Sequence, residues 1–466
     1  MPVTRVLVAN RGEIALRVLR ACQQMGIETV LATSTADRDS LPAREADRSI
    51  CIGPAISAQS YLNVNLIVEA ALGCGADAVH PGYGFLSESP ELSQACADAG
   101  LTFIGPKPGQ IRDMGNKIEA RKQAKAFGLP MLPGSEKVHS CQEASEVAGR
   151  IGFPVMLKAA AGGGGRGMKI VTRAEQLEGL FRSASAEAKA AFGDDSLYLE
   201  RYIANARHVE VQVLGDQFGH VIHLGERDCS LQRRHQKLVE ESPAPNIAEP
   251  LREAIRQAGV TLARSIGYEN AGTVEFIYDE DEKKFYFLEM NTRIQVEHPV
   301  SEMVTGIDLV QEQIRVARGE HLRFRQEDIV FRGHAVECRI NAEVPHENFR
   351  PSPGRITQWL PPQGPNIRVD SHCYSGYAVP PYYDSMIGKL IVYGADRTEA
   401  LDRMGHALAR FKVVGIGTTL AFLEGVMAHP DFRAGRVSTS LVGRMLDESG
   451  SRAAAGSPEP GASPNK

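Results

Sequence analysis

The chain has 466 residues, 43% hydrophobic and 23% charged, which is typical of a globular protein with about two to four domains. A formal net charge of −5 gives no global reason to expect nucleic acid or an anionic membrane as a partner. No secretory signal is expected, and no window approaches the roughly 18 apolar residues of a membrane span. The 8 cysteines form no C-x-x-C pair, which favours reduced thiols and a cytoplasmic protein.

Short β-branched segments alternate with amphipathic helices in residues 1–115. RVLVAN predicts the first strand, and Gly12 begins a helix that places Ile14, Val18 and Leu19 on one face. Further strand–helix units follow, ending with the strand LTFIGP. Such βα repeats with short loops predict a parallel sheet that carries helices on both faces.

The rest of the chain changes character along its length. Residues 116–134 predict a charged helix ended by Gly-Leu-Pro, and 135–203 predict a small α/β unit around a glycine-rich loop. Residues 204–447 are rich in β-type segments that are interrupted by helices. Residues 448–466 are small, polar and proline-rich, and we expect them to be disordered.

The glycine-rich loop, KAAAGGGGRGM, satisfies the letters of a dinucleotide-binding G-x-G-x-x-G at Gly162, Gly164 and Gly167. That motif requires a helix after the loop, whereas MKIVT resembles a strand, and no Gly-Lys-Ser/Thr completes a Walker A motif. Glycines between two strands instead predict a flap whose amides close over phosphate, with Lys158 placing its ammonium on a phosphate. A flexible surface hairpin is the alternative interpretation.

GTVEFIYD and KFYFLEMN, around an acidic turn, predict a β-hairpin. If the turn spans 280–284, Glu275 lies opposite Glu289. The same register gathers these residues on the apolar face: Val274, Phe276, Tyr278, Tyr286, Leu288 and Met290. Opposed carboxylates repel unless a cation lies between them, and with Asn291 the oxygen donors suit Mg²⁺. A solvated, charged sheet face is the alternative.

Polar residues also alternate along EMNTRIQVEHP. Read as a strand, this segment presents on one face Glu289, Asn291, Arg293, Gln295 and Glu297. Upstream, ERDCSLQRRHQKLVEESPAP groups polar and basic residues that fit an anion pocket or a surface patch: Arg227, Gln232, Arg233, Arg234, His235 and Lys237. Arg339, on the predicted strand AVECRINAE, needs a partner for its charge, and His80 is assigned no catalytic role.

The most specific features of the chain are its long motifs: VANRGEIALRVLRAC, HPGYGFLSE, GGGGRGM, ERDCSLQRRHQKLVEESPAP, EMNTRIQVEHPVSE and YYDSMIGKL. Together, over residues 3–447, they resemble the biotin carboxylase component of biotin-dependent carboxylases, which is an ATP-grasp enzyme. The resemblance implies a multidomain α/β and α+β fold: a Rossmann-like N-terminal domain (1–115), a helical linker (116–134), an ATP-grasp lid (135–203) and a C-terminal catalytic domain (204–447).

The resemblance also implies roles for residues at matching positions. Contacts with ATP are expected from Lys117, Lys158, Gly164, Gly165, Glu200, Arg201, Tyr202, Ile203, His208, Gln232, His235, Glu275, Ile277 and Glu289. Mg²⁺ or Mn²⁺ is expected at Glu275, Glu289 and Asn291. Bicarbonate is expected at Lys237, Arg293, Gln295 and Val296, with Arg339 beside biotin. The expected catalytic residues are Arg293, Lys237, Arg339 and Glu297, the last as the base that deprotonates bicarbonate.

The implied activity is carboxylation of biotin by bicarbonate and ATP through carboxyphosphate, the first half-reaction of acetyl-CoA carboxylase and of fatty acid synthesis. A propionyl-CoA, other acyl-CoA, pyruvate or 2-oxoglutarate carboxylase is the alternative, as are another ATP-grasp ligase and a regulatory module without turnover. No A-M-K-M attachment site occurs, so biotin is expected on a separate carrier protein, with carboxyltransferase subunits and a homodimer as further partners. Ala160, Ala161 and Arg201 depart modestly from the common pattern.

Overall fold

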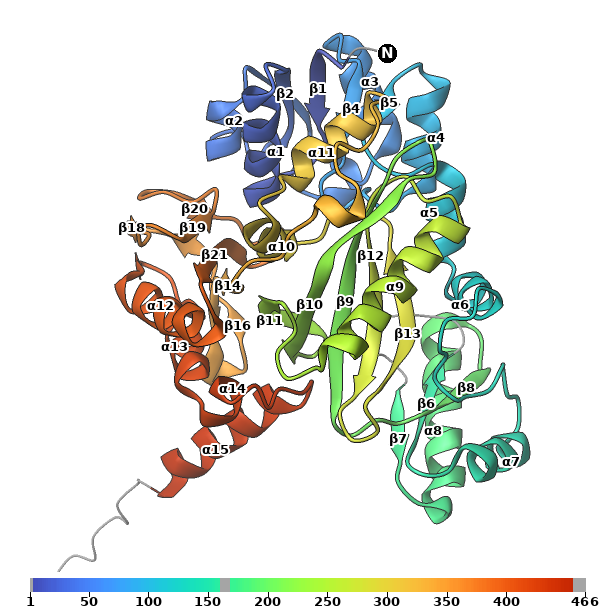
Figure 1. Ribbon diagram of the computed structural model, residues 1–466. Helices are drawn as coiled ribbons and strands as arrows, with labels where there is room; N and C mark the ends of the chain where they lie inside the picture. Colours follow the sequence, from blue (N-terminus) through green and yellow to red (C-terminus); the bar gives the residue numbers. More distant parts are fainter. Residues whose placement is uncertain (1–2, 160–167, 456–466) are drawn as a thin grey trace, which may run out of the picture.

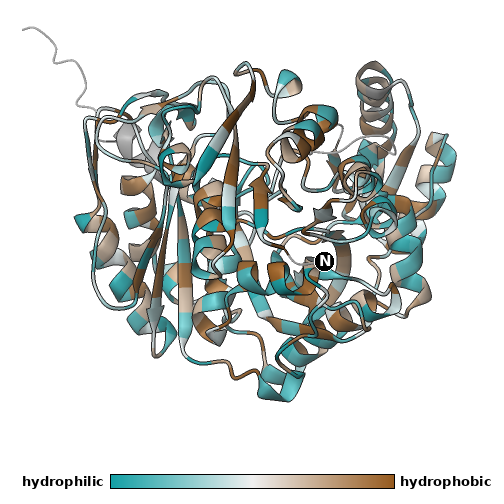
Figure 2. Ribbon diagram, turned by 90° about the horizontal axis from the view of Figure 1, so that it is seen from above, coloured by the Kyte–Doolittle hydropathy of each residue, from teal (hydrophilic) through white to brown (hydrophobic). Residues whose placement is uncertain are grey.

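The computed structural model describes residues 3–159 and 168–455. The N-terminal unit lies at the top of Figure 1, the lid (residues 135–203) at the lower right and the last helices at the lower left, with long central strands between them. In Figure 2 apolar stretches run along strands, while peripheral helices are banded with hydrophilic and hydrophobic residues. No helix in the described ranges combines the length and the apolar character needed to cross a bilayer.

A parallel five-stranded sheet forms the N-terminal unit, as the βα repeats predict. Its strands, in spatial order, are β3 (Arg48–Gly53), β2 (Glu28–Ser34), β1 (Arg5–Val8), β4 (Ala78–His80) and β5 (Thr102–Phe103). Its helices are α1 (Gly12–Gln24), α2 (Leu41–Glu45), η1 (Ser57–Gln59), α3 (Val64–Gly73), α4 (Pro90–Asp98) and α5 (Pro108–Gly115). Val6 and Val8 pack against α1, whereas Leu7 packs with Ile67 and Leu92 on the other face. Alternation along β1 thus supplies a core to each face of the sheet.

The lid contains a three-stranded antiparallel sheet, ordered β7-β6-β8, and follows helix α6 (Lys117–Ala126). Its elements are α7 (Cys141–Ile151), β6 (Val155–Ala159), β7 (Lys169–Val171), η2 (Ala174–Gln176), α8 (Leu177–Phe192) and β8 (Leu197–Arg201). Strand β6 pairs with β7 across the glycine-rich loop, which itself lies outside the described residues. The strand–loop–strand prediction is confirmed, and the dinucleotide fingerprint is excluded because no helix follows the loop.

An eight-stranded antiparallel sheet forms the centre of the molecule. Its strands, in spatial order, are β13 (Lys284–Asn291), β12 (Asn270–Asp279), β9 (Ala206–Gly215), β10 (Val221–Arg233), β11 (Gln236–Ser242), β14 (His334–Asn341), β21 (Met386–Gly394) and β19 (Ile367–Asp370). Helix α9 (Glu249–Ser265) covers one face, where Ile255 and Leu262 pack with Val211 and Phe276. Helices α10 (His298–Thr305) and α11 (Leu309–Ala317) connect this sheet to the N-terminal unit, because Leu309 and Ile314 share a core with Val8 and Val18.

The remaining elements surround the β14 end of the sheet. The short strands pair as β15 (Glu343–Val344) with β16 (Arg350–Pro351), β17 (Gly354–Arg355) with β20 (Ala378–Val379), and β18 (Gln358–Leu360) with β22 (Lys412–Val414). The helices are η3 (Gln326–Asp328), η4 (Pro345–Glu347), α12 (Arg397–Arg410), α13 (Leu420–Ala428), α14 (Pro430–Arg433) and α15 (Leu441–Ala455). Helix α15 continues beyond residue 448, where the disordered tail was predicted to begin, and 456–466 lie outside the described residues.

The hairpin of β12 and β13 differs from the prediction in one respect. Glu275 pairs with Glu289 as predicted, but a bulge next to this pair shifts the register, so that Phe276 pairs with Phe287. Phe287 therefore enters the core beside Phe276, and Tyr286 and Leu288 leave the predicted apolar face. The prediction failed because β13 contains one additional residue at the bulge. The side chains of β13 between the bulge and the turn therefore point to the face opposite to the predicted one.

The strand predicted over EMNTRIQVEHP ends early. Strand β13 stops at Asn291, and α10 begins at His298, so residues 292–297 form a connecting loop. The side chains of Arg293, Gln295 and Glu297 in this loop still line one cavity, together with Glu289 and Asn291 of β13.

Candidate active site

A cavity of about 610 Å³ lies between the lid, the central sheet and the loop after β13. It is lined by every described residue to which the family resemblance assigns a role: Lys117, Lys158, Glu200, Arg201, Tyr202, Ile203, His208, Gln232, His235, Lys237, Glu275, Ile277, Glu289, Asn291, Arg293, Gln295, Val296, Glu297 and Arg339. Gly164 and Gly165 lie outside the described residues. Residues scattered over the sequence therefore share one enclosed space.

Cations line the lid side of this cavity. The Lys158 Nζ lies 2.5 Å from Glu200 Oε2, and Arg121 NH1 lies 2.5 Å from Glu200 Oε1. Lys117 Nζ, at the start of α6, lies 3.2 Å from Glu289 Oε2. Glu200 is buried, so its charge is balanced by Lys158 and Arg121, and it holds Lys158 at the cavity wall. The sequence analysis missed Arg121.

An apolar slot occupies the junction of lid and sheet. Ile203, in the connection from β8 to β9, packs with Leu132, Ala206 and Tyr286, and Ile277 lies against this group. The backbone of Arg201 is held by Pro133, whose carbonyl accepts its N–H at 2.8 Å. A slot of apolar side chains beside the backbone of Arg201 has the character expected for a flat heterocyclic ring.

The opposed carboxylates Glu275 and Glu289 lie on the cavity face of the hairpin. Glu275 Oε1 accepts hydrogen bonds from Asn291 Nδ2 and Gln295 Nε2, both at 2.9 Å. Glu289 is only partly buried, with Lys117 as its ion-pair partner. Two carboxylates and an amide oxygen form an all-oxygen donor set, so these residues fit Mg²⁺ or Mn²⁺ by their chemistry.

Lys237 is the centre of a cluster of negative charge. Its Nζ lies 2.6 Å from Glu210 Oε2, 3.2 Å from Glu275 Oε1 and 2.5 Å from Glu297 Oε1. Burial alone would lower the pKa of Lys237, but these carboxylates raise it well above its ordinary value. The ammonium is therefore a permanent positive charge at the cavity floor.

Glu297 lies between two cations. Its second oxygen, Oε2, accepts a hydrogen bond from Arg339 NH2 at 2.8 Å. Burial would raise the pKa of Glu297, but Lys237 and Arg339 lower it below its ordinary value, so the carboxylate is ionised. Glu240 also accepts from Arg339, at 2.5 Å, and burial together with Glu297 raises the pKa of Glu240 to about 7. The guanidinium of Arg339 is thus shared by two carboxylates.

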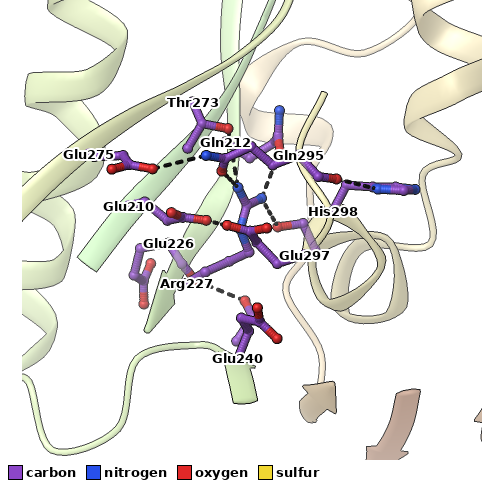
Figure 3. A network of polar contacts seen from close by, with 12 residues as sticks. Glu210, Gln212, Glu226, Arg227, Glu240, Thr273, Glu275, Gln295, Glu297 and His298 are labelled. Carbon is purple, nitrogen blue, oxygen red and sulfur yellow. Dashed lines mark hydrogen bonds and ion pairs between the residues drawn. The ribbon is translucent and has the colours of Figure 1, made fainter. Parts of the chain in front are cut away.

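Arg227 is not among the residues that line the cavity, and it lies at the centre of a network of polar contacts (Figure 3). It is fully buried, and its guanidinium donates to Glu210 Oε1 and Gln212 Oε1 at 2.7 Å and to Gln295 Oε1 at 3.0 Å. Further donations reach Thr273 and Ser301. Arg227 thereby orients Gln295, which lines the cavity, and Glu210, whose other oxygen binds Lys237.

The basic cluster predicted as an anion pocket is therefore only partly correct. Gln232, His235 and Lys237 line the cavity, whereas Arg233 and Arg234 do not. The Arg233 guanidinium instead donates to Asn348 and lies 4.4 Å from the ring centre of Phe349. The β10–β11 turn separates these residues, because Arg234 and His235 adopt positive φ and redirect the chain.

The N-terminal unit reaches into the site through Glu88. Its Oε2 accepts from Arg293 Nε at 2.8 Å, and its Oε1 accepts from the Thr292 backbone N–H at 3.1 Å. Sequence reasoning missed Glu88, Glu210 and Glu240 as supports of site residues. The polar alternation in HVEVQV could have indicated Glu210, while Glu88 lies within the motif HPGYGFLSE without a distinguishing pattern.

A second cavity, of about 500 Å³, adjoins the first. Both cavities are lined by Lys237, Val296 and Arg339. The far wall of the second comes from the turn before α1 and from residues 382–386. The Lys389 Nζ, buried below, holds the Val296 backbone by donating to its carbonyl at 2.8 Å. The two cavities thus meet at a wall that carries the positive charges of Lys237 and Arg339.

Known proteins match this chain along nearly its full length. Family models match the biotin carboxylase N-terminal domain at residues 2–111, the ATP-binding domain of the carbamoyl-phosphate synthase L chain at 116–325, and the biotin carboxylase C-terminal domain at 337–444. A biotin carboxylase of Nostoc sp. is 54% identical over 446 residues, which cover 96% of this chain and 100% of the relative.

Solved structures agree in fold. A biotin carboxylase–β,γ-ATP complex from Campylobacter jejuni has 50% identity and a TM-score of 0.90, covering 95% of this chain and 99% of that one. The biotin carboxylase domain of Hydrogenobacter thermophilus 2-oxoglutarate carboxylase, in complex with MgADP, ADP and bicarbonate, has 48% identity and a TM-score of 0.88, covering 95% and 97%. The chain belongs to the biotin carboxylase family of ATP-dependent ligases.

Proposed function

We propose that the protein carboxylates biotin, presented on a separate carrier protein, with bicarbonate and ATP. The observation that supports this most strongly is the junction of the two cavities at Lys237, Val296 and Arg339. The larger cavity has an apolar slot, cations and an oxygen donor set, which suit a nucleoside triphosphate with its metal. The smaller cavity offers the acceptor a separate entrance to the same charged wall.

On the nucleotide side, Lys117 and Lys158 would bind phosphate oxygens, and the glycine-rich loop with Gly164 and Gly165 would close over them. The adenine would contact Glu200, Arg201, Tyr202, Ile203 and Ile277, and the remaining nucleotide contacts would come from His208, Gln232 and His235. Glu275, Glu289 and Asn291 would hold Mg²⁺ or Mn²⁺. When bound, this metal supplies positive charge against the phosphate oxygens.

Bicarbonate would lie against Lys237, Arg293, Gln295 and Val296. These residues would hold bicarbonate next to the negatively charged phosphates of ATP, although the two anions repel each other in water. The ionised Glu297 would accept the proton of bicarbonate as the bicarbonate oxygen bonds to the γ-phosphorus and ADP leaves, which yields carboxyphosphate. Closure of the site would exclude water from this labile product.

The acceptor step would use the other side of the same wall. Carboxyphosphate breaks into CO₂ and phosphate, and the phosphate takes the proton from the ureido nitrogen of biotin, which then bonds to CO₂. The guanidinium of Arg339 would stabilise the negative charge that develops on the ureido oxygen. Glu240 and Glu297 hold that guanidinium at the junction of the cavities.

We also propose acetyl-CoA carboxylase as the complex served, with a biotin carboxyl carrier protein, carboxyltransferase subunits and a second copy of this chain as partners in the cytoplasm. The relative from Hydrogenobacter belongs to a 2-oxoglutarate carboxylase and is similar to this chain at 48% identity, so a 2-oxo-acid carboxylase is the second candidate. Isolation of the native complex, with assays of acetyl-CoA and 2-oxo acids as acceptors, distinguishes the two.

The activity itself is tested with the purified chain, Mg²⁺, ATP, bicarbonate and free biotin. The expected result is ADP release that depends on both bicarbonate and biotin, with carboxybiotin as product. ATP cleavage that is indifferent to both compounds would contradict the proposal.

A further inference from the structure

Three metal-ligating side chains converge at a surface remote from both cavities. Asp216 follows β9, His220 precedes β10, and His321 lies in the segment after α11. One ligand atom from each side chain lies within 4.8 Å of the other two. None of the three lines the cavities described above.

The carboxylate of Asp216 is held in one orientation by the backbone. Its Oδ1 accepts N–H groups of Phe218 and His220 at 2.9 Å and 3.0 Å, and its Oδ2 accepts the Leu322 N–H at 3.2 Å. Burial would raise the pKa of Asp216, but these donors and His220 lower it. A buried, ionised and immobile carboxylate thus faces the two imidazoles.

Both imidazoles approach the same oxygen. Asp216 Oδ2 lies 3.3 Å from His220 Nδ1 and 3.8 Å from His321 Nδ1. Ligand atoms around a tetrahedral zinc ion lie about 3.3–3.4 Å apart, given zinc–ligand distances of about 2.0–2.1 Å. The Phe218 ring stacks on His321 with ring centres 3.7 Å apart, which limits rotation of that imidazole.

This arrangement favours a shared ion over simple ion pairs. Two protonated imidazoles on one carboxylate oxygen would repel each other, whereas neutral imidazoles can both donate lone pairs to one cation. Two nitrogens and one oxygen suit a borderline-soft transition metal and not Mg²⁺, which the all-oxygen set of the larger cavity suits. The side chains of His220 and His321 are 69% and 63% exposed, so an ion can enter and water can complete its coordination.

We propose that Asp216, His220 and His321 form a structural site for one divalent transition-metal ion of the Zn²⁺ class. The ion would connect the β9–β10 turn to the segment after α11. Both segments emerge from one apolar core that contains Leu214, Ile222 and Ile314. Because the ion would bind the folded chain and not the unfolded chain, it would raise the melting temperature.

The test is isothermal titration of Zn²⁺ into the chelator-treated full chain, with excess Mg²⁺ and ADP present to occupy the larger cavity. The matched variants are His220→Ala, His321→Ala and, as a control, His346→Ala. His346 is 82% exposed and lies 3.8 Å from Glu347, so it is an exposed histidine paired with a carboxylate outside this site. Far-ultraviolet circular dichroism checks that each variant folds.

The proposal expects one Zn²⁺ per chain in the wild type and in His346→Ala, with a rise in melting temperature. It expects affinity to fall by at least about 10-fold in His220→Ala and in His321→Ala, since even loss of an outer partner commonly costs about 10–100-fold. Visible absorption bands of bound Co²⁺, present in the wild type and lost in both variants, give a second readout. Unchanged Zn²⁺ binding in His220→Ala and His321→Ala would overturn the proposal, as would a wild type without a stoichiometric site.

Discussion

Lys237 and Glu297 form a buried ion pair in which Nζ lies 2.5 Å from Oε1, while the other oxygen of Glu297 is bound to Arg339. This geometry keeps Glu297 ionised between two cations, as its proposed role as a base requires. We predict that Glu297→Gln lowers biotin carboxylation by about 10²–10⁴-fold, the usual contribution of a general base. ATP binding, measured by titration calorimetry, should change little. Normal turnover in this variant would show that Glu297 is not the base.

Glu88 should act on bicarbonate through Arg293. Glu88→Gln removes the charge that holds the Arg293 guanidinium at 2.8 Å, a type of hydrogen bond that contributes about 1.5–3 kcal/mol. We expect the KM for bicarbonate to rise by about 10-fold or more, with a smaller change in kcat. Glu91→Gln, an exposed carboxylate on α4, is the matched control and should leave both constants unchanged. A fall in kcat alone would contradict the positioning role.

Removal of one metal carboxylate should change the metal requirement of the enzyme. Glu289→Gln replaces one of the two proposed carboxylate donors by a neutral amide oxygen, so the Mg²⁺ concentration for half-maximal activity should rise by about 10-fold or more. Glu282→Gln, in the turn of the same hairpin, should keep the wild-type requirement. An identical Mg²⁺ titration of Glu289→Gln and wild type would argue against a metal at this position.

Lys389 should be essential for stability. It is fully buried, with Nζ 3.1 Å from Glu13 Oε1. Lys389→Met leaves Glu13 buried without that partner, and we expect a loss of about 3–5 kcal/mol, seen as a lower urea midpoint. The double variant Lys389→Met/Glu13→Gln should recover part of this loss, because the charge of Glu13 is removed together with its partner. A double variant less stable than the single one would refute the charge argument.

We predict that the burial of His223 makes the folded protein less stable in mild acid. Burial and the nearby charge of Arg256 lower the pKa of His223 from 6.5 to about 4. Between these values the unfolded chain binds a proton that the folded chain does not, so stability falls as the pH decreases, by up to about 1.4 kcal/mol per pH unit. Melting temperatures of wild type and His223→Gln at pH 7.5 and 5.5 test this. The variant should show the shallower pH dependence, whatever its stability at pH 7.5, and equal slopes would contradict the prediction.

Local patterns predicted much of the fold and of the site. Glu275 and Glu289 were placed opposite each other by hairpin register alone, and the strands on either side of the glycine-rich loop were predicted correctly. The bulge that turns Tyr286 and Leu288 away from the core leaves no signal in the alternation of apolar residues. Register arguments therefore hold only up to the first inserted residue.

The supporting residues were beyond prediction for a different reason. Glu88 of the N-terminal unit binds Arg293 of the loop after β13, and Arg121 of α6 binds Glu200 of the lid strand β8. Such pairs depend on how separately formed elements pack, and a charged residue with a distant partner has the same local pattern as a solvated one. The family motifs identified the residues that line the cavity, but not the carboxylates that hold those residues in position.

The central sheet runs without a break from the hairpin of β12 and β13 to β19. Val239 of β11 pairs with Cys338 of β14, so the sheet crosses from the nucleotide-binding half of the chain to its C-terminal part. A fragment cut between β13 and β14 would leave β11 as an edge strand with unpaired backbone groups, a template for self-association. It would also lose Arg339 and leave Glu240 and Glu297 without that cation. The two parts of the chain therefore depend on each other for a complete sheet and for a complete site.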